Sequence, residues 1–423
     1  MHGWRRLAIA GAGSRGEWWT REVARRFSDR IEIVAICDRN PGRAKRLAGV
    51  ISEHGQKPDL YGSDGYRRML AEKKPDVVLI AVPDKDHGEY AVDAMRGGAD
   101  ALVEKPLAAS VDDMRAILKA RRETGKRCVV TFNMRWAPSI TQLKDILMTG
   151  VIGVPVAATM QWLLNTSHGA DYFRRWHRNL ANSGGLLVHK STHHFDTVNW
   201  LMDSTPTAVF ARGSRRFYRP ETAVELGLSG RGERCLECPV KAKCPYPLDL
   251  QASQGLREVY LENEGHDGYQ RDRCIFSSEI DIPDSMSVAA RFASGAYLTY
   301  SLQAFSPWEG FTLAIDGTRG RLEHRSEDGV GATTRVLPLN GPAQNPAVWV
   351  GEGQHGGADD PLIDSLFGDE RPADRWGRHA DERAGAWSAL VGLTANASIA
   401  QGREIQVSEL VPELFETATR AGA

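Results

Sequence analysis

Titratable side chains stand close together between positions 184 and 196. They are His189, Lys190, His193, His194 and Asp196. In a helix, residues four apart share a face, so His189 and His193 would lie one turn apart, with Asp196 three residues further on. Histidine titrates near neutral pH and is suited to accept and return a proton. The pattern predicts a proton-transfer site with His193 as acid/base; a structural polar network or a His/His/Asp metal site would use the same residue types.

A second reactive side chain is Lys105, which follows the apolar run at 101–104. If that run is a strand of a parallel sheet, Lys105 lies at the carboxyl edge of the sheet, where such sheets bind ligands. A lysine there can hydrogen-bond a reacting oxygen and stabilise its developing negative charge. We expect a catalytic role, and a surface salt bridge to Glu104 is the structural alternative.

The first apolar run, at 7–10, leads into a G-x-G-x-x-G match at 11–16. A helix is predicted over 17–27, followed by a strand over 31–37 that ends at Asp38. Dinucleotide sites have this order, because the glycines permit a tight turn, a close approach of backbone to pyrophosphate, and close packing of helix on strand. Asp38 is placed to accept the ribose hydroxyls, which favours NAD, while Arg39 leaves NADP open. A purely structural turn is the alternative.

Strands and helices alternate as far as residue 132. Strands are predicted at 76–82, 101–104 and 127–132, and helices at 87–96 and from the capping pair Ser110 and Asp113 to about residue 123. This alternation is typical of a doubly wound parallel sheet. Later runs at 156–163, 287–292, 296–303 and 311–315 indicate strands of a mixed or antiparallel sheet.

The length of 423 residues suits two domains of unequal size. We predict an α/β chain in which an N-terminal NAD(P)-binding Rossmann domain with a doubly wound parallel sheet spans 1–132. A C-terminal α+β domain with a large open mixed or antiparallel sheet would span 133–423 and serve substrate binding and oligomerisation.

The composition excludes several classes of partner. Hydrophobic residues make up 42% and charged residues 25%, which is the balance of a folded, water-soluble protein. The net charge of -1 offers no basic field for a nucleic acid. No stretch approaches the ~18 uninterrupted apolar residues of a membrane span. We therefore expect a cytoplasmic protein with neither nucleic-acid nor membrane partners.

Four of the six cysteines cluster: Cys235, Cys238, Cys244 and Cys274. A C-x-x-C pair can hold one ion from a tight loop, and two further thiolates complete a tetrahedral set. The spacing predicts a structural Zn²⁺ that pins a Cys-rich insertion at about 217–275, with an iron–sulfur cluster or no metal as alternatives.

Aromatic and cationic side chains interleave between 169 and 178. Aromatic faces stack on sugar CH surfaces and cations bind hydroxyls, which favours a carbohydrate substrate over the alternative of a solvated loop. Arg135 and the segment 355–359 are weaker candidates for the same cleft. The substrate contacts that we expect are Arg135, Tyr172, Arg174, Trp176, His177, His194 and Asp196.

Glu104-Lys105-Pro106 resembles the E-K-P motif of the Gfo/Idh/MocA oxidoreductase family. Further matches follow in the family's order. They are Val82-Pro83-Asp84 with His87, then 133–138, Gly184-Gly185 followed by His193 and Asp196, 317–320, and 395–398. The resemblance covers nearly the whole chain. It implies a C-terminal sheet that faces the active site or a partner subunit, and assembly as a homodimer or homotetramer.

The resemblance also implies roles for single residues. His193 holds the family's catalytic or substrate-binding histidine position, whereas His189 stands where many members have aspartate, which implies a proton relay and substrate contacts that differ from the family's. The catalytic groups would be Lys105, His193, His189 and Lys190. The dinucleotide would be bound by Gly11, Ala12, Gly13, Ser14, Arg15, Gly16, Asp38, Arg39, Val82, Pro83, His87, Glu104 and Lys105.

These features predict an NAD(P)-dependent oxidoreductase that transfers hydride between a nicotinamide and a secondary alcohol of a sugar, glycoside or cyclitol. The alternative is a glycoside hydrolase or lyase that oxidises a hydroxyl only transiently. The ketone would acidify the neighbouring C–H, permit elimination and then be reduced again, with no net redox. A non-catalytic cofactor-binding sensor is a third reading, against which Lys105 and His193 argue.

Overall fold

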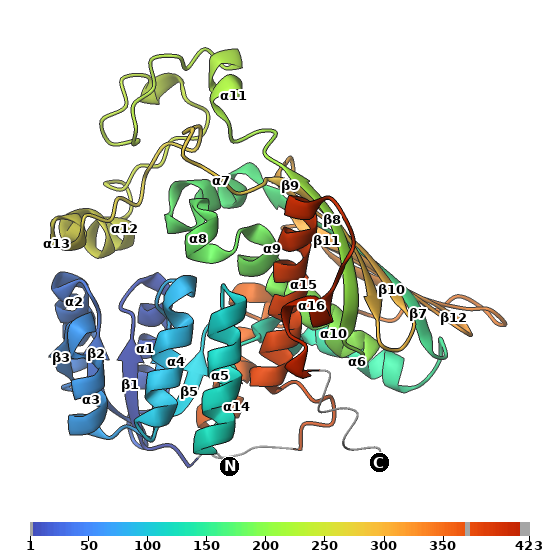
Figure 1. The fold of residues 1–423 in the computed structure, drawn as a ribbon, viewed down its shortest axis with the longest axis horizontal. Coiled ribbons are helices and arrows are strands. Elements are labelled where there is room, and N and C mark those ends of the chain that lie inside the picture. Colours follow the sequence, from blue (N-terminus) through green and yellow to red (C-terminus); the bar gives the residue numbers. More distant parts are fainter. Residues whose placement is uncertain (1–2, 369–372, 415–423) are drawn as a thin grey trace.

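The structure, a computed structural model, describes residues 3–368 and 373–414. Two sheets organise the chain (Figure 1). The N-terminal sheet lies between helices, the second sheet is long and twisted, and a segment poor in strands projects beside both. Within the described residues, no helix is both long and apolar enough to cross a membrane.

The N-terminal sheet has seven strands in the order β14-β6-β5-β4-β1-β2-β3. Its strands are β1 (Arg6–Ala10), β2 (Glu32–Cys37), β3 (Asp59–Tyr61), β4 (Val77–Ile80), β5 (Asp100–Val103), β6 (Cys128–Val130) and β14 (Ala380–Asp381). Neighbouring strands pair in parallel except β14, which is antiparallel to β6. Strands β4, β5 and β6 are buried at every residue, as expected for a parallel sheet covered on both faces.

The helices of this part confirm the doubly wound fold. They are α1 (Ser14–Phe27), α2 (Pro41–Ser52), α3 (Tyr66–Lys73), α4 (His87–Arg96) and α5 (Val111–Thr124). The observed α4 has the bounds predicted from the sequence. Ser110 caps α5 by accepting a hydrogen bond from the Asp113 amide at 3.1 Å, as its spacing indicated.

The second sheet has eight strands in the order β13-β12-β11-β7-β10-β9-β8-β15. They are β7 (Pro155–Asn165), β8 (Pro206–Ser214), β9 (Ser285–Phe292), β10 (Tyr297–Ser306), β11 (Gly310–Gly317), β12 (Gly320–Glu327), β13 (Gly331–Pro338) and β15 (Ile405–Gln406). Among the described strands of this sheet, only β7 and β10 pair in parallel, so the predicted mixed sheet is confirmed. Residues alternate between buried and exposed along β9, which places one face of the sheet against helices and the other toward solvent.

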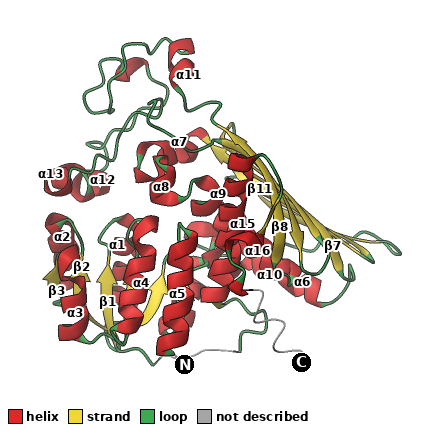
Figure 2. Cartoon of the chain, viewed as in Figure 1, coloured by secondary structure: helices red, strands yellow, loops and turns green. Residues whose placement is uncertain are grey.

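Helices gather on one side of this sheet (Figure 2). The longest is α15 (Glu382–Gln401), which packs on β8 and on α10 (Ser191–Met202). The shorter helices are α6 (Pro138–Met148), α7 (Thr166–Arg174), α8 (Leu180–Ser183), α9 (Leu186–His189) and α16 (Val407–Leu410). The helix α14 (Asp359–Phe367) instead packs against α1 of the N-terminal part.

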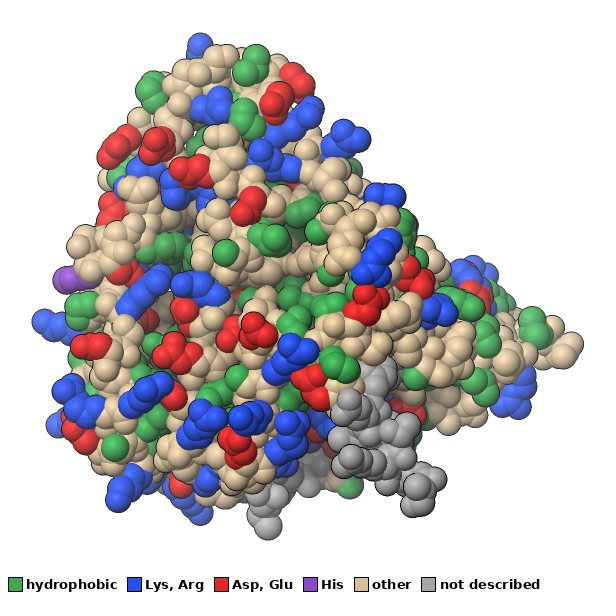
Figure 3. All heavy atoms as spheres, viewed as in Figure 1, with side chains coloured by type: hydrophobic (Ala, Val, Ile, Leu, Met, Phe, Trp, Pro, Cys, Tyr) green, Lys and Arg blue, Asp and Glu red, His purple; other side chains and the backbone are tan. Residues whose placement is uncertain are grey.

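Residues 217–275 form the insertion between β8 and β9. It holds three short helices, α11 (Pro220–Glu225), α12 (Gln254–Val259) and α13 (Glu264–Asp267). In Figure 1 the chain runs outward through α11 and returns so that α12 and α13 lie beside α2 of the N-terminal part. The surface in this view mixes acidic and basic side chains (Figure 3), in keeping with a net charge of -1.

Candidate active site

A cleft of about 880 Å³ lies where the carboxyl ends of β1, β2, β4 and β5 meet the second part of the chain. Most of the residues predicted from the sequence line it. They are Gly11, Gly13, Ser14, Arg15, Asp38, Arg39, Val82, Pro83, His87, Glu104, Lys105, Tyr172, Trp176, His177, His189 and His193. Because parallel strands end at one edge, residues far apart in the sequence come together there.

The glycine turn has the shape that a dinucleotide requires. Gly11 has a φ of +102°, and a Cβ there would lie 2.4 Å from the Ala81 carbonyl oxygen. A Cβ on Gly16 would lie 1.9 Å from the Gly11 carbonyl oxygen. Gly13 instead faces open space, because the nearest atom to a Cβ there is the Tyr260 hydroxyl at 3.9 Å. The backbone before α1 therefore leaves room for a phosphate at the helix N-terminus.

Asp38 connects this turn to the end of β2. One carboxylate oxygen accepts a hydrogen bond from the Ala12 amide at 2.6 Å, and the other accepts one from the Asn40 amide at 2.7 Å. Ala12 and Gly16 thus shape the turn, although neither residue lines the cleft. The carboxylate of Asp38 remains at the cleft wall, where a ribose would lie. The residues present therefore fit an adenine dinucleotide.

Glu104 and His87 support the loop that carries Lys105. Glu104 Oε1 accepts hydrogen bonds from Arg15 Nε and Trp19 Nε1, each at 2.7 Å. Burial raises the pKa of Glu104, but the charges of Arg15 and Lys105 and the hydrogen bonds from Arg15 and Trp19 together outweigh it, and the net shift is downward. The ring nitrogens of His87 lie 2.7 Å from the Pro106 oxygen and 3.0 Å from the Val82 oxygen, which joins the ends of β4 and β5.

Lys105, His189 and Asp84 form a connected row across the cleft. Lys105 Nζ donates to the His189 carbonyl oxygen at 3.2 Å and lies 3.4 Å from His189 Nε2. On its other side, His189 Nδ1 lies 2.5 Å from the Asp84 carboxylate. With Nδ1 donating to Asp84, the lone pair of Nε2 faces Lys105. This row has the order amine, imidazole, carboxylate.

Burial controls the protonation of this row. Desolvation lowers the pKa of Lys105 and, together with the charge of Lys105, lowers the pKa of His189 well below its usual value. Desolvation also raises the pKa of Asp84. Each shift favours the uncharged form, so the Lys105 amine and the His189 imidazole keep lone pairs that can accept a proton.

The segment around His189 is not one continuous helix, so the condition on which the sequence placed His189 and His193 one turn apart is not met. The helix α9 ends at His189, Lys190 follows with φ −91° and ψ −49°, and α10 begins at Ser191. Gly184 and Gly185, both at positive φ, start α9 as a separate turn. His189 and His193 nevertheless line the same cleft as Lys105.

His193 carries a buried Nδ1 without a hydrogen-bond partner among the described residues. Burial and the nearby charge of Lys105 lower its pKa well below the usual value, so the ring is neutral near pH 7. Lys190 lies behind it, with Nζ 5.1 Å from the Trp162 ring centre. Burial and Lys105 lower the pKa of Lys190 to about 8.

An aromatic wall stands beside the row. Trp176 and His177 stack with ring centres 3.6 Å apart, and His177 lies 4.0 Å from the His189 ring centre. The Tyr172 hydroxyl lies 3.0 Å from His168 Nε2, and His168 Nδ1 lies 2.6 Å from Glu309. The cleft thus combines flat apolar faces with hydrogen-bonding groups, which is what a sugar requires.

Four predicted substrate residues lie away from this cleft. Arg135 pairs with Asp196, at 2.7 and 2.5 Å, beside a separate surface cavity. His194 is fully buried, stacks on Trp162 at 3.9 Å and contacts the Tyr300 hydroxyl at 2.8 Å. Arg174 donates to the Tyr246 carbonyl oxygen at 2.5 Å. Of the three predicted site residues in α10, His193 lies on the side of the helix that lines the cleft. His194 and Asp196 lie on other sides of the helix and are buried.

The predicted metal centre is not supported. Among residues 3–368 and 373–414, no group of three or more His, Cys, Asp or Glu side chains is arranged to hold a metal ion. Cys235, Cys238, Cys244 and Cys274 are free thiols that line one small pocket of the insertion. Arg174 Nη1 and the Leu248 amide each lie 3.4 Å from the Cys235 sulfur, so the contacts of that sulfur are with these donors.

Several cleft residues were absent from the predicted set. Asp84 stands in a motif that the sequence displayed, but its contact with His189 joins residues 105 positions apart. Asp171 and Arg175 belong to the interleaved segment and meet at 3.3 Å. Tyr260 and Tyr269 come from the insertion, for which the sequence indicated only a metal-bound structural role.

Known families match the chain along two stretches. The model described as "Oxidoreductase family, NAD-binding Rossmann fold" matches residues 5–132. The model described as "Oxidoreductase family, C-terminal alpha/beta domain" matches residues 144–337. The two stretches contain β1 to β6 and β7 to β13, respectively.

Individual relatives match over different lengths. A Bacillus subtilis (strain 168) protein, YteT, whose name describes it as an oxidoreductase, is 33% identical over 96% of this chain and 98% of its own length. An inositol 2-dehydrogenase of Rubrobacter xylanophilus is 26% identical over 52% of this chain and 57% of its own length. Glycosyl hydrolase family 109 protein 1 of Akkermansia muciniphila is 33% identical, but over only 35% of this chain and 31% of its own length.

Solved structures share the fold. The WlbA dehydrogenase from Bordetella pertussis, in complex with NADH and UDP-GlcNAcA, aligns with a TM-score of 0.64 over 95% of this chain and 98% of that chain. The sequence identity is 18%, so this likeness concerns the fold alone.

Proposed function

Since the chain belongs to the Gfo/Idh/MocA oxidoreductase family, we propose that it is an NAD-dependent dehydrogenase acting on a secondary alcohol of a sugar, glycoside or cyclitol. The observation that carries this proposal is the row Lys105–His189–Asp84, which ends in the cleft beside the glycine turn. In this proposal residues 1–132 bind the cofactor, and residues 133–423 bind the substrate and a partner subunit.

The cofactor is assigned to the residues that shape the β1–α1 turn. The Gly13 backbone and the α1 N-terminus would hold the pyrophosphate, and Asp38 the ribose hydroxyls. When bound, the dinucleotide supplies the hydride acceptor at its nicotinamide. A carboxylate at the ribose favours NAD over NADP.

Proton removal is assigned to Lys105. In its neutral form, the Nζ lone pair takes the proton of the substrate hydroxyl, and the O–H electron pair becomes part of the C=O bond as the C–H bond breaks. Burial helps because it lowers the pKa of Lys105 and enlarges the neutral fraction near pH 7. His189, which Asp84 orients, would accept the proton from Lys105. His193 would hydrogen-bond a hydroxyl of the substrate.

The walls of the cleft support a polyhydroxylated substrate. Tyr172 and Trp176 offer flat faces, while Asp171, Arg175 and His168 offer hydrogen-bonding groups around them. An inositol 2-dehydrogenase among the relatives agrees with this class, although the match covers about half of each chain. The solvent-facing side of the second sheet is the surface that we assign to a homodimer or homotetramer contact.

A hydrolase or lyase with transient oxidation is the second candidate. It is favoured by the likeness of one third of the chain to glycosyl hydrolase family 109 proteins and by the several bases near Lys105. Both candidates begin with the same oxidation. They differ in whether reduced cofactor leaves the enzyme.

Absorbance at 340 nm, followed while the purified protein is offered NAD⁺ with a panel of inositols, sugars and aryl glycosides, tests the proposal. A steady rise with one substrate class, abolished in Lys105→Met, would support the dehydrogenase. Release of aglycone without a net rise would favour the second candidate instead. Failure to bind either nicotinamide cofactor would contradict both. Asp112→Asn, exposed on α5, is the matched control.

A further inference from the structure

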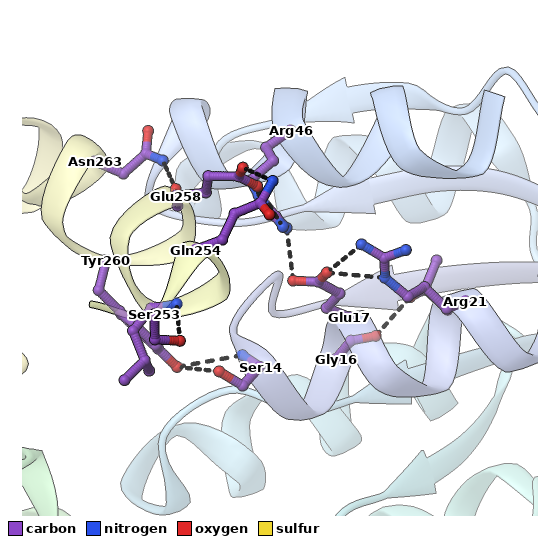
Figure 4. Close-up of polar contacts among 12 residues, drawn as sticks. Ser14, Gly16, Glu17, Arg21, Arg46, Ser253, Gln254, Glu258, Tyr260 and Asn263 are labelled. Atoms are coloured by element: carbon purple, nitrogen blue, oxygen red, sulfur yellow. Dashed lines mark hydrogen bonds and ion pairs between the residues drawn. The ribbon is translucent and has the colours of Figure 1, made fainter. Parts of the chain in front are cut away.

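The returning part of the insertion forms a wall of the proposed dinucleotide site. Figure 4 shows α12 and the following turn against α1 and α2. Glu258 pairs with Arg46 at 3.0 Å, and the Tyr260 hydroxyl lies 2.7 Å from Ser14 Oγ and 3.3 Å from the Ser14 amide. Both Tyr260 and Ser14 line the cleft, so this segment reaches the N-terminus of α1.

The same segment closes on the turn that follows Asp38. Asn40 Nδ2 donates to the Asn263 carbonyl oxygen at 2.8 Å. A Cβ on Gly42 would lie 1.8 Å from Asn263 Oδ1, so the Asn263 side chain packs directly on the Gly42 backbone. The insertion is therefore packed against the residues that surround the ribose position.

Asp267, at the end of α13, places a carboxylate in this corner. It contacts the Arg43 guanidinium directly and lies 3.5 Å from Arg39 Nε. Arg43 also lies 3.5 Å from Asp38, and the side chains of Arg43 and Asp267 are each only 6% exposed. Burial raises the pKa of Asp267, but the hydrogen bond and charge of Arg43 together with hydrogen bonds from the Tyr269 amide and Asn40 outweigh it, so the net shift is downward and favours the ionised carboxyl.

The charges of the corner therefore cancel: Asp38 and Asp267 offset Arg39 and Arg43. Arg43 lines the cleft, and its buried Nη1 has no hydrogen-bond partner among the described residues. This N–H is a donor left for a ligand. Beside two carboxylates, it suits the neutral oxygen of a ribose hydroxyl better than the dianionic oxygen of a phosphate.

We propose that Asp267 of the insertion is a cofactor-specificity residue, which excludes a 2′-phosphate by neutralising Arg39 and Arg43. The inference rests on the proposed binding of a nicotinamide dinucleotide and extends it. Arginines beside the ribose are what NADP sites use to bind the 2′-phosphate. Without Asp267, this corner would carry a net positive charge and would have the composition of an NADP site.

The test is a pair of binding titrations by calorimetry, with NAD⁺ and NADP⁺ as the probes and no substrate present. In Asp267→Asn we expect the affinity for NADP⁺ to rise by roughly tenfold or more, and the affinity for NAD⁺ to change by less than about threefold. Asp267→Glu keeps the charge and should keep the preference of the wild type. Glu262→Gln, on an exposed carboxylate of the same insertion, is the matched control and should change neither affinity.

If the ratio of the affinity for NADP⁺ to the affinity for NAD⁺ is the same in Asp267→Asn as in the wild type, the inference is overturned. In that case, NAD⁺ binding by the wild type would still leave the proposed function standing. If the wild type binds neither dinucleotide, both fail. A further measurement needs no change at Asp267: the wild type should bind adenosine 5′-monophosphate more tightly than adenosine 2′,5′-bisphosphate. Equal or tighter binding of the bisphosphate would contradict the role of Asp267 even if its variants do not fold.

Discussion

The His189 imidazole bridges the two parts of the chain: its Nδ1 lies 2.5 Å from Asp84, which follows β4, and its Nε2 lies 3.4 Å from Lys105, which follows β5. His189 itself ends α9 in the second part. Many members of the family have an aspartate at the His189 position, and here a carboxylate is supplied from the Rossmann sheet instead. A carboxylate and an imidazole are thereby paired across the two parts of the chain.

Asp84→Ala should lower kcat by about 10²-fold, because His189 loses the acceptor that orients its ring and selects its tautomer. The KM for NAD⁺ should stay within about threefold, since the contacts of Gly13 and Asp38 are untouched. Steady-state kinetics in both substrates measure this division. Equal losses in kcat and in cofactor affinity would instead indicate general disruption of the cleft.

Lys105→Arg should leave cofactor binding unchanged but lower kcat by about 10²- to 10⁴-fold, because a guanidinium remains protonated and cannot serve as the base. In the wild type, kcat/KM should rise with pH as Lys105 loses its proton and then level off. Since burial lowers the pKa of Lys105, the plateau should begin below the usual pKa of 10.5 for lysine. A profile without a rising limb would exclude Lys105 as the base.

Lys190 makes stability depend on pH. Burial and the charge of Lys105 hold its folded-state pKa at about 8, below the 10.5 of an unfolded chain. Between these values the unfolded state binds more protons, so the free energy of unfolding rises with pH. We expect urea unfolding to show that the free energy of unfolding of the wild type, relative to that of Lys190→Met, rises from pH 8 to 10.5. A constant difference would contradict the shift.

Gly11→Ala should destabilise the fold by about 1–3 kcal/mol or more, because φ is strained for alanine and the methyl group would meet the Ala81 carbonyl oxygen. Gly49→Ala is the control, since Gly49 lies within α2 and a Cβ there meets nothing within 4 Å. That change should stabilise the protein by about 0.5–1 kcal/mol. Thermal unfolding of the two variants distinguishes a required glycine from a tolerated one.

Local patterns predicted much of the fold. The buried runs of the Rossmann sheet, the α4 helix at 87–96, the Ser110 cap and the mixed second sheet each depend on residues near one another in the sequence. The Gly11 turn and Lys105 were found for the same reason: each stands at the end of a recognisable strand.

Contacts between distant segments were not predictable in this way. The 189–196 stretch placed its histidines only on the condition that it is helical, whereas the helix is interrupted at Lys190 and His194 lies in the core. The Asp84 contact depends on docking of α9 onto the Rossmann sheet. Asp267 reaches Arg43 only because the insertion returns to α2, and the cysteine spacing that drew attention to this insertion indicated a metal instead.

Transfer of deuterium is the most direct test of the central claim that this cleft oxidises a carbinol carbon. The substrate identified by the 340 nm assay, labelled with deuterium at that carbon, is incubated with NAD⁺, and the reduced cofactor is analysed by mass spectrometry. We predict one deuterium per reduced cofactor in the wild type and no labelled cofactor with Lys105→Met. Substrate consumption with unlabelled cofactor, and deuterium retained in the released product, would contradict a dehydrogenase that exports its reducing equivalent.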